Sequence, residues 1–214
     1  MLVYSGMADK QITVQPAHIK GLRLAVNTYG LDDLPQEERD GYQRLLDALQ
    51  KDGAEVQQVS HPNSPHQSII HRCEFREDLE RYLANKKVRR GTLESIIKGY
   101  KADPEVRMPY GINILENAMV HSRDLPIYAG AMAERQKARA ALWEELKDVD
   151  ACIMTGGTNI MHFTGLPSIA LPMCMGEDGV PLGIILYGAE ERRLLAAALV
   201  IQRYCPGSRP PRLD

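Results

Sequence analysis

The chain lacks a strong excess of charge of either sign. Its 214 residues contain 26 Lys and Arg against 28 Asp and Glu, which gives a formal net charge of −2 at pH 7. A chain balanced in this way has no broad basic field that would attract nucleic acid or an anionic membrane surface. We therefore expect neither nucleic acid nor a membrane among its partners.

Long apolar runs and targeting signals are also lacking. No run reaches the roughly 18 apolar residues that a membrane-spanning helix needs. The N-terminal MLVYSGMADK has no basic segment followed by an apolar core, so it is not typical of a signal peptide. The cysteines form no Cys-x-x-Cys pair, and Cys152 and Cys174 lie in apolar runs. These features indicate reduced, buried thiols in a cytoplasmic protein.

Motifs for a cofactor or a nucleophile are absent as well. The sequence has no Gly-x-Gly-x-x-Gly or Walker pattern, and therefore no nucleotide cofactor is expected. It has no Gly-x-Ser-x-Gly elbow and no glycine-rich run around a serine. His71, Glu74 and Asp78 fall at helical spacing and are either metal ligands or a solvated polar face. The sequence shows no further partner for such a site, so we favour the solvated face and expect no bound metal.

The length of 214 residues, with 44% hydrophobic and 25% charged residues, is typical of a globular protein with one domain or two small ones, and we expect one domain over residues 1–214. Strands are expected at 20–26, 54–59 and 149–155, and periodicity and end signals predict the second and the third. The same signals predict helices at 35–52, 65–85, 126–147 and 190–204, with Thr92 as the N-cap of a further element. The first strand, helix and second strand form a parallel βαβ unit. In the helix at 65–85 the expected apolar stripe is Ile70, Phe75, Leu79, Tyr82 and Leu83.

A β-hairpin organises the C-terminal third. Ser168–Leu171 and Gly183–Tyr187 are apolar runs on either side of Gly176-Glu177-Asp178-Gly179, and Asp-Gly is a strong turn signal. Neither run alternates, which predicts strands that are buried on both faces. The resulting fold class is α/β, with a mixed, largely buried β-sheet flanked by helices on both faces.

The hairpin sequence TGLPSIALPMCMGEDGVPLGIILYG, residues 164–188, resembles the C-terminal sheet segment of the amidase signature family. Other segments resemble segments of that family in the same order: KGLRLAV at 20–26, which corresponds to a family strand, EFREDLERYLA at 74–84, TLESII at 92–97, PYGINIL at 109–115 and VDACIMT at 149–155. The resemblance extends from Lys20 to the C-terminus. It implies the C-terminal half of an amidase, without the half that supplies the nucleophilic serine, the cis-peptide serine and the lysine base. The isolated chain is then expected to be inactive.

The resemblance also implies where a substrate pocket would lie. In the family the loop after the strand at 149–155 and the approach to the TGLP segment line the pocket. Thr155, Asn159, Phe163 and Thr164 are therefore expected as pocket walls, and no residue of this chain as a catalyst. Gly156 and Gly157 are either an anion-binding nest or a loop that needs positive φ, and the second is favoured.

The leading interpretation is the C-terminal part of an amidase-like hydrolase of carbon–nitrogen bonds, which supplies sheet core and pocket walls. The alternative is a non-catalytic binding or assembly module with the same half-fold. The expected partner is a separate N-terminal amidase half or a second copy in a homodimer, with Leu2–Met7 in the interface, and a small amide is the substrate if the half is complemented. No residue selects among amide substrates, which in the family include aminoacyl-tRNA.

Overall fold

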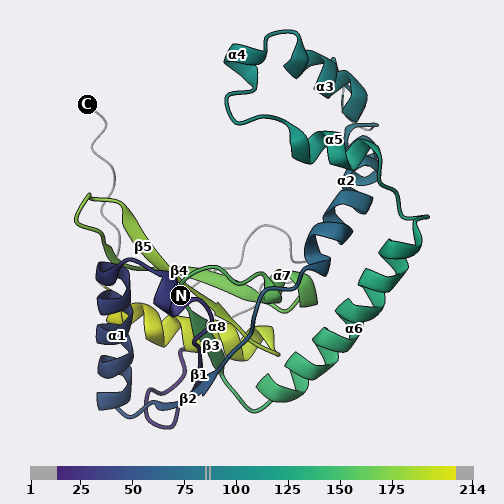
Figure 1. Cartoon of the computed structure of the whole chain (residues 1–214). Coiled ribbons are helices and arrows are strands. Elements are labelled where there is room, and N and C mark those ends of the chain that lie inside the picture. Colours follow the sequence, from purple (N-terminus) through teal and green to yellow (C-terminus); the bar gives the residue numbers. More distant parts are fainter. Residues whose placement is uncertain (1–13, 85, 87, 206–214) are drawn as a thin grey trace. The chain divides into compact units, whose positions relative to one another are not determined.

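The computed structural model describes residues 14–84, 86 and 88–205 (Figure 1). The segment Leu2–Met7, which we expect in an interface, lies outside the described residues. Contacts divide the chain into two compact units, Met1–Asn63 with Ala138–Asp214 and Ser64–Lys137. We call these the sheet unit and the helical unit. That they fold together as the single domain expected over residues 1–214 stays a prediction.

The sheet unit is built on five strands in the order β2-β1-β3-β5-β4. β1 pairs in parallel with β2 and with β3, whereas β5 pairs antiparallel with β3 and β4. The sheet is therefore mixed, and the predicted α/β class is confirmed. The strands are β1 Arg23–Asn27, β2 Glu55–Val59, β3 Ala151–Met154, β4 Ser168–Met175 and β5 Pro181–Tyr187.

Helices cover both faces of this sheet (Figure 1). On one face Leu24, Ile153 and Leu186 pack with α1 (Gln36–Lys51) and α8 (Glu191–Ile201). On the other face Ala25, Cys152 and Tyr187 pack with the C-terminal part of α6 (Pro126–Leu146) and with α7 (Ile160–Thr164). Two short 3-10 helices, Leu31–Asp33 and Gln202–Tyr204, complete the unit.

The predicted βαβ unit is confirmed as β1, α1 and β2. α1 buries its predicted stripe, and Tyr42 donates a hydrogen bond from its hydroxyl to the carbonyl of Ile153 at 2.9 Å. This contact fixes the helix on the central strand of the sheet. The helix that begins near Thr92 is also confirmed, since the Thr92 hydroxyl accepts a hydrogen bond from the Ser95 amide at 3.2 Å. Serine completes the capping box, in which Glu or Gln is more common.

The predicted hairpin forms, with longer strands and a register shift between Pro172 and Cys174. Gly179 in the turn has φ +81°, which a residue with a side chain rarely adopts. The prediction that both strands are buried on both faces is wrong for β4, because Ser168 and Ala170 are exposed. β4 lies at one edge of the sheet, where one face of its first half is uncovered. The apolar run thus reflects β-propensity and not two-sided burial.

The helical unit contains α2 (His66–Ala84), α3 (Leu93–Lys101), α4 (Pro104–Arg107), α5 (Asn113–Met119) and the first part of α6. Its small core joins Leu93, Ile97, Ile112 and Ala118, with Leu79 of α2 packed against them. The expected apolar stripe of α2 is only partly right. Ile70 is 4% exposed, but Phe75 is 40% exposed and Tyr82 is 65% exposed. A core of this size covers only one side of the helix.

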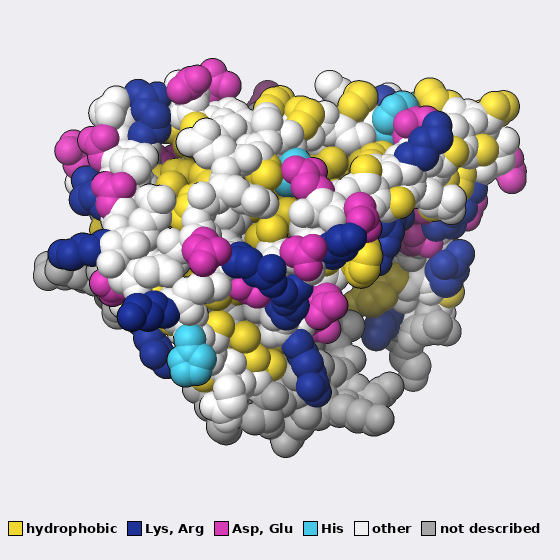
Figure 2. Space-filling view, turned by 90° about the horizontal axis from the view of Figure 1, so that it is seen from below, with side chains coloured by type: hydrophobic (Ala, Val, Ile, Leu, Met, Phe, Trp, Pro, Cys, Tyr) yellow, Lys and Arg dark blue, Asp and Glu magenta, His cyan; other side chains and the backbone are white. Residues whose placement is uncertain are grey.

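Within the described ranges, no helix is both long and apolar enough to cross a bilayer. On the face seen in Figure 2, acidic and basic side chains are interspersed and are not gathered by sign.

Candidate functional site

Thr155 follows β3 and joins three elements of the sheet unit. Its side chain is 1% exposed, and its hydroxyl donates to the carboxylate of Glu38 in α1 and to the carbonyl of Gly183 in β5 at 3.3 Å. A buried hydroxyl needs such partners. Thr155 therefore holds α1 against the sheet at the point where the chain leaves β3.

The other three expected pocket residues lie in or beside α7. Phe163 is 2% exposed, and Thr164 is fully buried with its hydroxyl donating to the carbonyl of Ile160 at 2.7 Å. Asn159 is half-buried, and its backbone amide donates to the side chain of Asn63 at 2.6 Å. The four predicted residues thus occupy one continuous stretch from β3 through α7. That they contact a substrate stays a prediction.

The loop after β3 requires glycine at position 156. The φ of Gly156 is +90°, and a Cβ there would lie 3.0 Å from the side chain of Leu34. The loop needs glycine for its backbone conformation and for this close approach, which agrees with the favoured interpretation. Thr158 then turns the chain, since its hydroxyl accepts the Ile160 amide at 3.2 Å as α7 begins.

A buried polar cluster that sequence reasoning missed lies on the same unit. Asn27 ends β1, and His61 follows β2 by two residues, so both stand at the carboxyl ends of neighbouring parallel strands, where α/β proteins commonly bind ligands. The Asn27 side chain accepts the His61 amide at 2.9 Å and donates to the Tyr187 hydroxyl at 3.2 Å. His61 Nδ1 lies 2.7 Å from that hydroxyl. The sequence signal for this cluster is that Asn27 and His61 are polar residues just after two predicted strands.

Burial decides what this cluster does chemically. It raises the pKa of the Cys152 thiol, which is hydrogen-bonded to Tyr187, to about 12, and it also raises the pKa of Tyr187. Both groups stay protonated at neutral pH, so neither is an activated nucleophile. His61 Nε2 faces Glu145 Oε2 at 3.3 Å without hydrogen-bond geometry, and it is buried with no other partner among the described residues. The contacts of the cluster join β1, β5 and the segment after β2, which stabilises the sheet.

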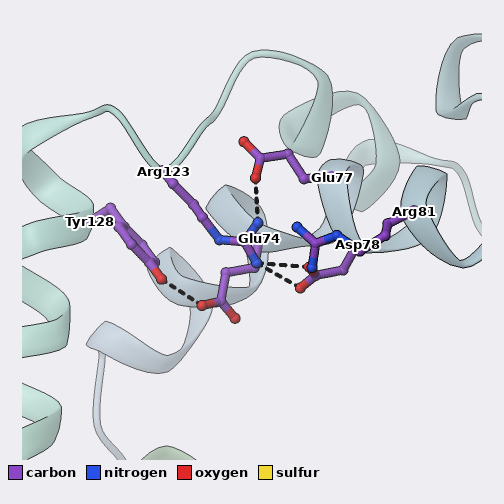
Figure 3. A network of polar contacts seen from close by, with 6 residues as sticks. All are labelled: Glu74, Glu77, Asp78, Arg81, Arg123 and Tyr128. Atoms are coloured by element: carbon purple, nitrogen blue, oxygen red, sulfur yellow. Dashed lines mark hydrogen bonds and ion pairs between the residues drawn. The ribbon is translucent and has the colours of Figure 1, made fainter.

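A second polar network lies in the helical unit (Figure 3). Arg123 donates to both carboxylate oxygens of Asp78 at 2.8 Å and also pairs with Glu77. Tyr128 donates its hydroxyl to Glu74 at 2.6 Å. The hydrogen bond with Asp78, followed by that with Glu77, raises the pKa of Arg123, and the bond with Glu74 raises the pKa of Tyr128. These contacts tie the segment before α6 to α2.

His71, Glu74 and Asp78, which share one helical face by their spacing, do line one cavity of about 370 Å³. Among the described residues, however, no three His, Cys, Asp or Glu side chains are arranged to hold a metal ion. The cavity also includes Phe75, Leu79 and Tyr82. Its walls are thus partly aromatic, which is not typical of a metal site.

No family model matches the chain. It is 24% identical over 230 residues to the A subunit of glutamyl-tRNA(Gln) amidotransferase from Brucella anthropi, in an alignment that covers 86% of this chain and 45% of that protein. The Brucella ovis protein of the same name gives the same figures. The chain therefore spans about half the length of the curated relatives that it matches.

Solved structures share the fold. An amidase family protein from Bacillus anthracis superposes with a TM-score of 0.75 at 20% identity, over 92% of this chain and 41% of that one. Peptide amidase from Stenotrophomonas maltophilia gives 0.74 at 21% identity, over 94% and 46%. A bacterial aryl acylamidase of the amidase signature family gives 0.59 at 14% identity, over 88% and 44%. The chain has part of an amidase fold, and it resembles the amidase signature family over that part.

Proposed function

We propose that this chain is the C-terminal part of an amidase-like hydrolase of carbon–nitrogen bonds. It supplies sheet core and pocket walls, and another polypeptide segment supplies the nucleophile and the base. The observation that carries the proposal is the match of nearly the whole chain to less than half of each amidase. The sequence adds support, since it has no glycine-rich run around a serine.

Within this proposal Thr155, Asn159, Phe163 and Thr164 form the wall of the pocket. Their position supports the assignment, because a loop that leaves a central strand presents its residues at one edge of the sheet. Asn159 is the half-buried member of the set, so it is the residue best placed to meet a substrate directly. The buried members shape the wall from behind. The substrate class is a small amide, and the compartment is the cytoplasm.

Co-expression tests the proposal. The chain is produced with the product of a neighbouring reading frame that carries a serine in a glycine-rich run, and hydrolysis of simple aromatic and aliphatic amides is followed. Activity is expected only when both polypeptides are present, because nucleophile and base must lie within hydrogen-bond reach. Replacing that serine by alanine is the control. Turnover by the purified 214-residue chain alone, sustained through repurification, contradicts the proposal.

The second candidate is a non-catalytic binding or assembly module. The cluster of Asn27, His61 and Tyr187 favours it, since these three buried polar side chains bond to one another. A stable complex with the neighbouring product that shows no amide hydrolysis, with the glycine-rich serine intact, supports this function over the first.

A further inference from the structure

The exposed side of α2 carries a groove that includes none of the four residues proposed for the wall of the substrate pocket. Its volume is about 370 Å³, which is in the range of small-molecule sites. It is lined by six side chains of successive turns of one helix: His71, Glu74, Phe75, Asp78, Leu79 and Tyr82. All of them belong to the helical unit.

The aromatic walls of the groove are available to a ligand. Phe75 is 40% exposed and Tyr82 is 65% exposed, although their spacing predicts a place in the core. Leu79 packs against the small core of the unit and forms the base between them. A ligand with an apolar body would remove this surface from water, which is favourable at about 25 cal/mol per Å².

The polar wall of the groove belongs to a network with more acidic than basic groups. Asp78 is neutralised by Arg123 at 2.8 Å and by Arg81 at 3.1 Å. Glu74 instead accepts the neutral hydroxyl of Tyr128 through one oxygen, and its second oxygen has no partner among the six residues of Figure 3. The network of Figure 3 contains three carboxylates (Glu74, Glu77 and Asp78) and two guanidinium groups (Arg81 and Arg123), so it is acidic overall beside the aromatic rings. Such a site is complementary to a cation with an apolar body.

The ring of Tyr82 already interacts with a cation. The ammonium nitrogen of Lys86 lies 5.3 Å from the centroid of this ring, within the distance at which the face of an aromatic ring attracts a cation. Lys86 is exposed and follows the end of α2 by two residues. It shows that this ring is accessible to an ammonium group.

We propose that the groove binds a small organic ammonium compound. Its ammonium group pairs with Glu74, and its apolar body lies on Phe75 and Leu79, with Tyr82 closing the side. The rival occupant, a lysine side chain of another polypeptide, has the same charge but brings a peptide backbone. The volume of about 370 Å³ and the combination of apolar and acidic side chains in its walls favour the small compound.

Binding of 2-phenylethylamine to the whole chain tests the proposal, with 2-phenylethanol and 3-phenylpropionate as neutral and anionic analogues of similar size. Ligand-observed NMR titration gives the three dissociation constants. The amine is expected to bind about 5-fold or more tightly than the alcohol, because one partly buried charge pair distinguishes them. Equal binding of amine and alcohol overturns the proposal. Tighter binding of acetyl-Ala-Lys-Ala-amide than of the amine also overturns it in favour of a polypeptide.

Two variants locate the site. Glu74→Gln is expected to weaken amine binding about 5-fold while leaving the alcohol unchanged. Tyr82→Ala removes the side wall of the groove, and it is expected to weaken the amine and the alcohol by the same factor of about 2 to 5 through lost apolar contact. Glu94→Gln removes the same charge from an exposed position in α3 and is the matched control. Helical circular dichroism checks that each variant is folded. Unchanged amine binding in folded Glu74→Gln contradicts the site.

Discussion

His61 Nδ1 lies 2.7 Å from the hydroxyl of Tyr187, and the two side chains are 6% and 0% exposed. The rings also meet edge to face, with centroids 5.9 Å apart. This contact links the segment after β2 to the end of β5, and Asn27 of β1 bonds to both partners. Three strands of the sheet are thereby joined through side chains as well as through their backbone ladder.

Removing the hydroxyl by Tyr187→Phe is expected to destabilise the sheet unit by about 1–3 kcal/mol, because His61 Nδ1 and the Asn27 amide each lose a buried partner. Tyr204→Phe is the control. The Tyr204 hydroxyl donates to Asp52 at 2.7 Å near the surface, where water replaces the lost partner, so its cost is expected to be below about 1 kcal/mol. Urea melts of both variants measure the difference. Equal small costs contradict the structural role of the cluster.

Alkaline pH is expected to destabilise the protein through Cys152. Burial raises the pKa of this thiol from 9.0 to about 12, so the folded state favours the neutral form. The stabilisation is complete below pH 9, where the unfolded thiol is also protonated, and it is lost as the pH rises towards 12. Within this window the free energy of unfolding should fall by about 1.4 kcal/mol per pH unit from this group.

Cys152→Ala isolates this contribution. The variant keeps every other group that titrates at alkaline pH, so the difference in unfolding free energy between it and the parent chain should narrow from pH 9 upward. Denaturant melts at pH 7, 9, 10 and 11 measure that difference. A difference independent of pH means that the thiol titrates at its ordinary pKa.

The hairpin provides a prediction on packing. Leu171, Ile184 and Leu186 are at most 6% exposed, and changing each to Ala is expected to cost about 2–5 kcal/mol through lost transfer energy and a cavity. Ile169 is half-buried at the edge strand, so its cost should be smaller. Glu177→Ala in the exposed turn is the control and should cost less than about 1 kcal/mol. Similar costs at all five sites in denaturant melts contradict the strand assignment.

The fold was more predictable from the sequence than the site was. Hydrophobic periodicity predicts the strands and the long helices. The Asp178-Gly179 pair predicts the turn, because the turn needs a residue that adopts positive φ. The exposure of Phe75 and Tyr82 cannot be predicted from local signals, because it depends on the small size of the core against which α2 packs. The contact of His61 with Tyr187 spans 126 positions, and no local pattern records it.

Self-association is the last prediction, and it follows from the position of β4. This strand is at one end of the strand order and begins with an uncovered face at Ser168 and Ala170. An unpaired strand edge is a template for another strand. We therefore expect a dimer of the 23.9 kDa chain at micromolar concentration, measured by sedimentation velocity.

Ala170→Lys places a charge on that edge without touching the core. It should shift the equilibrium from dimer towards monomer, because a lysine on an edge strand opposes pairing with another chain. Gln57→Lys is the matched control, since Gln57 is exposed on β2, the strand at the other end of the order. It should leave the dimer in place if β4 is the interface. A parent chain that sediments as a monomer contradicts the prediction. A dimer that dissociates in Gln57→Lys but not in Ala170→Lys assigns the interface to β2, because like charges introduced at a paired edge repel across it.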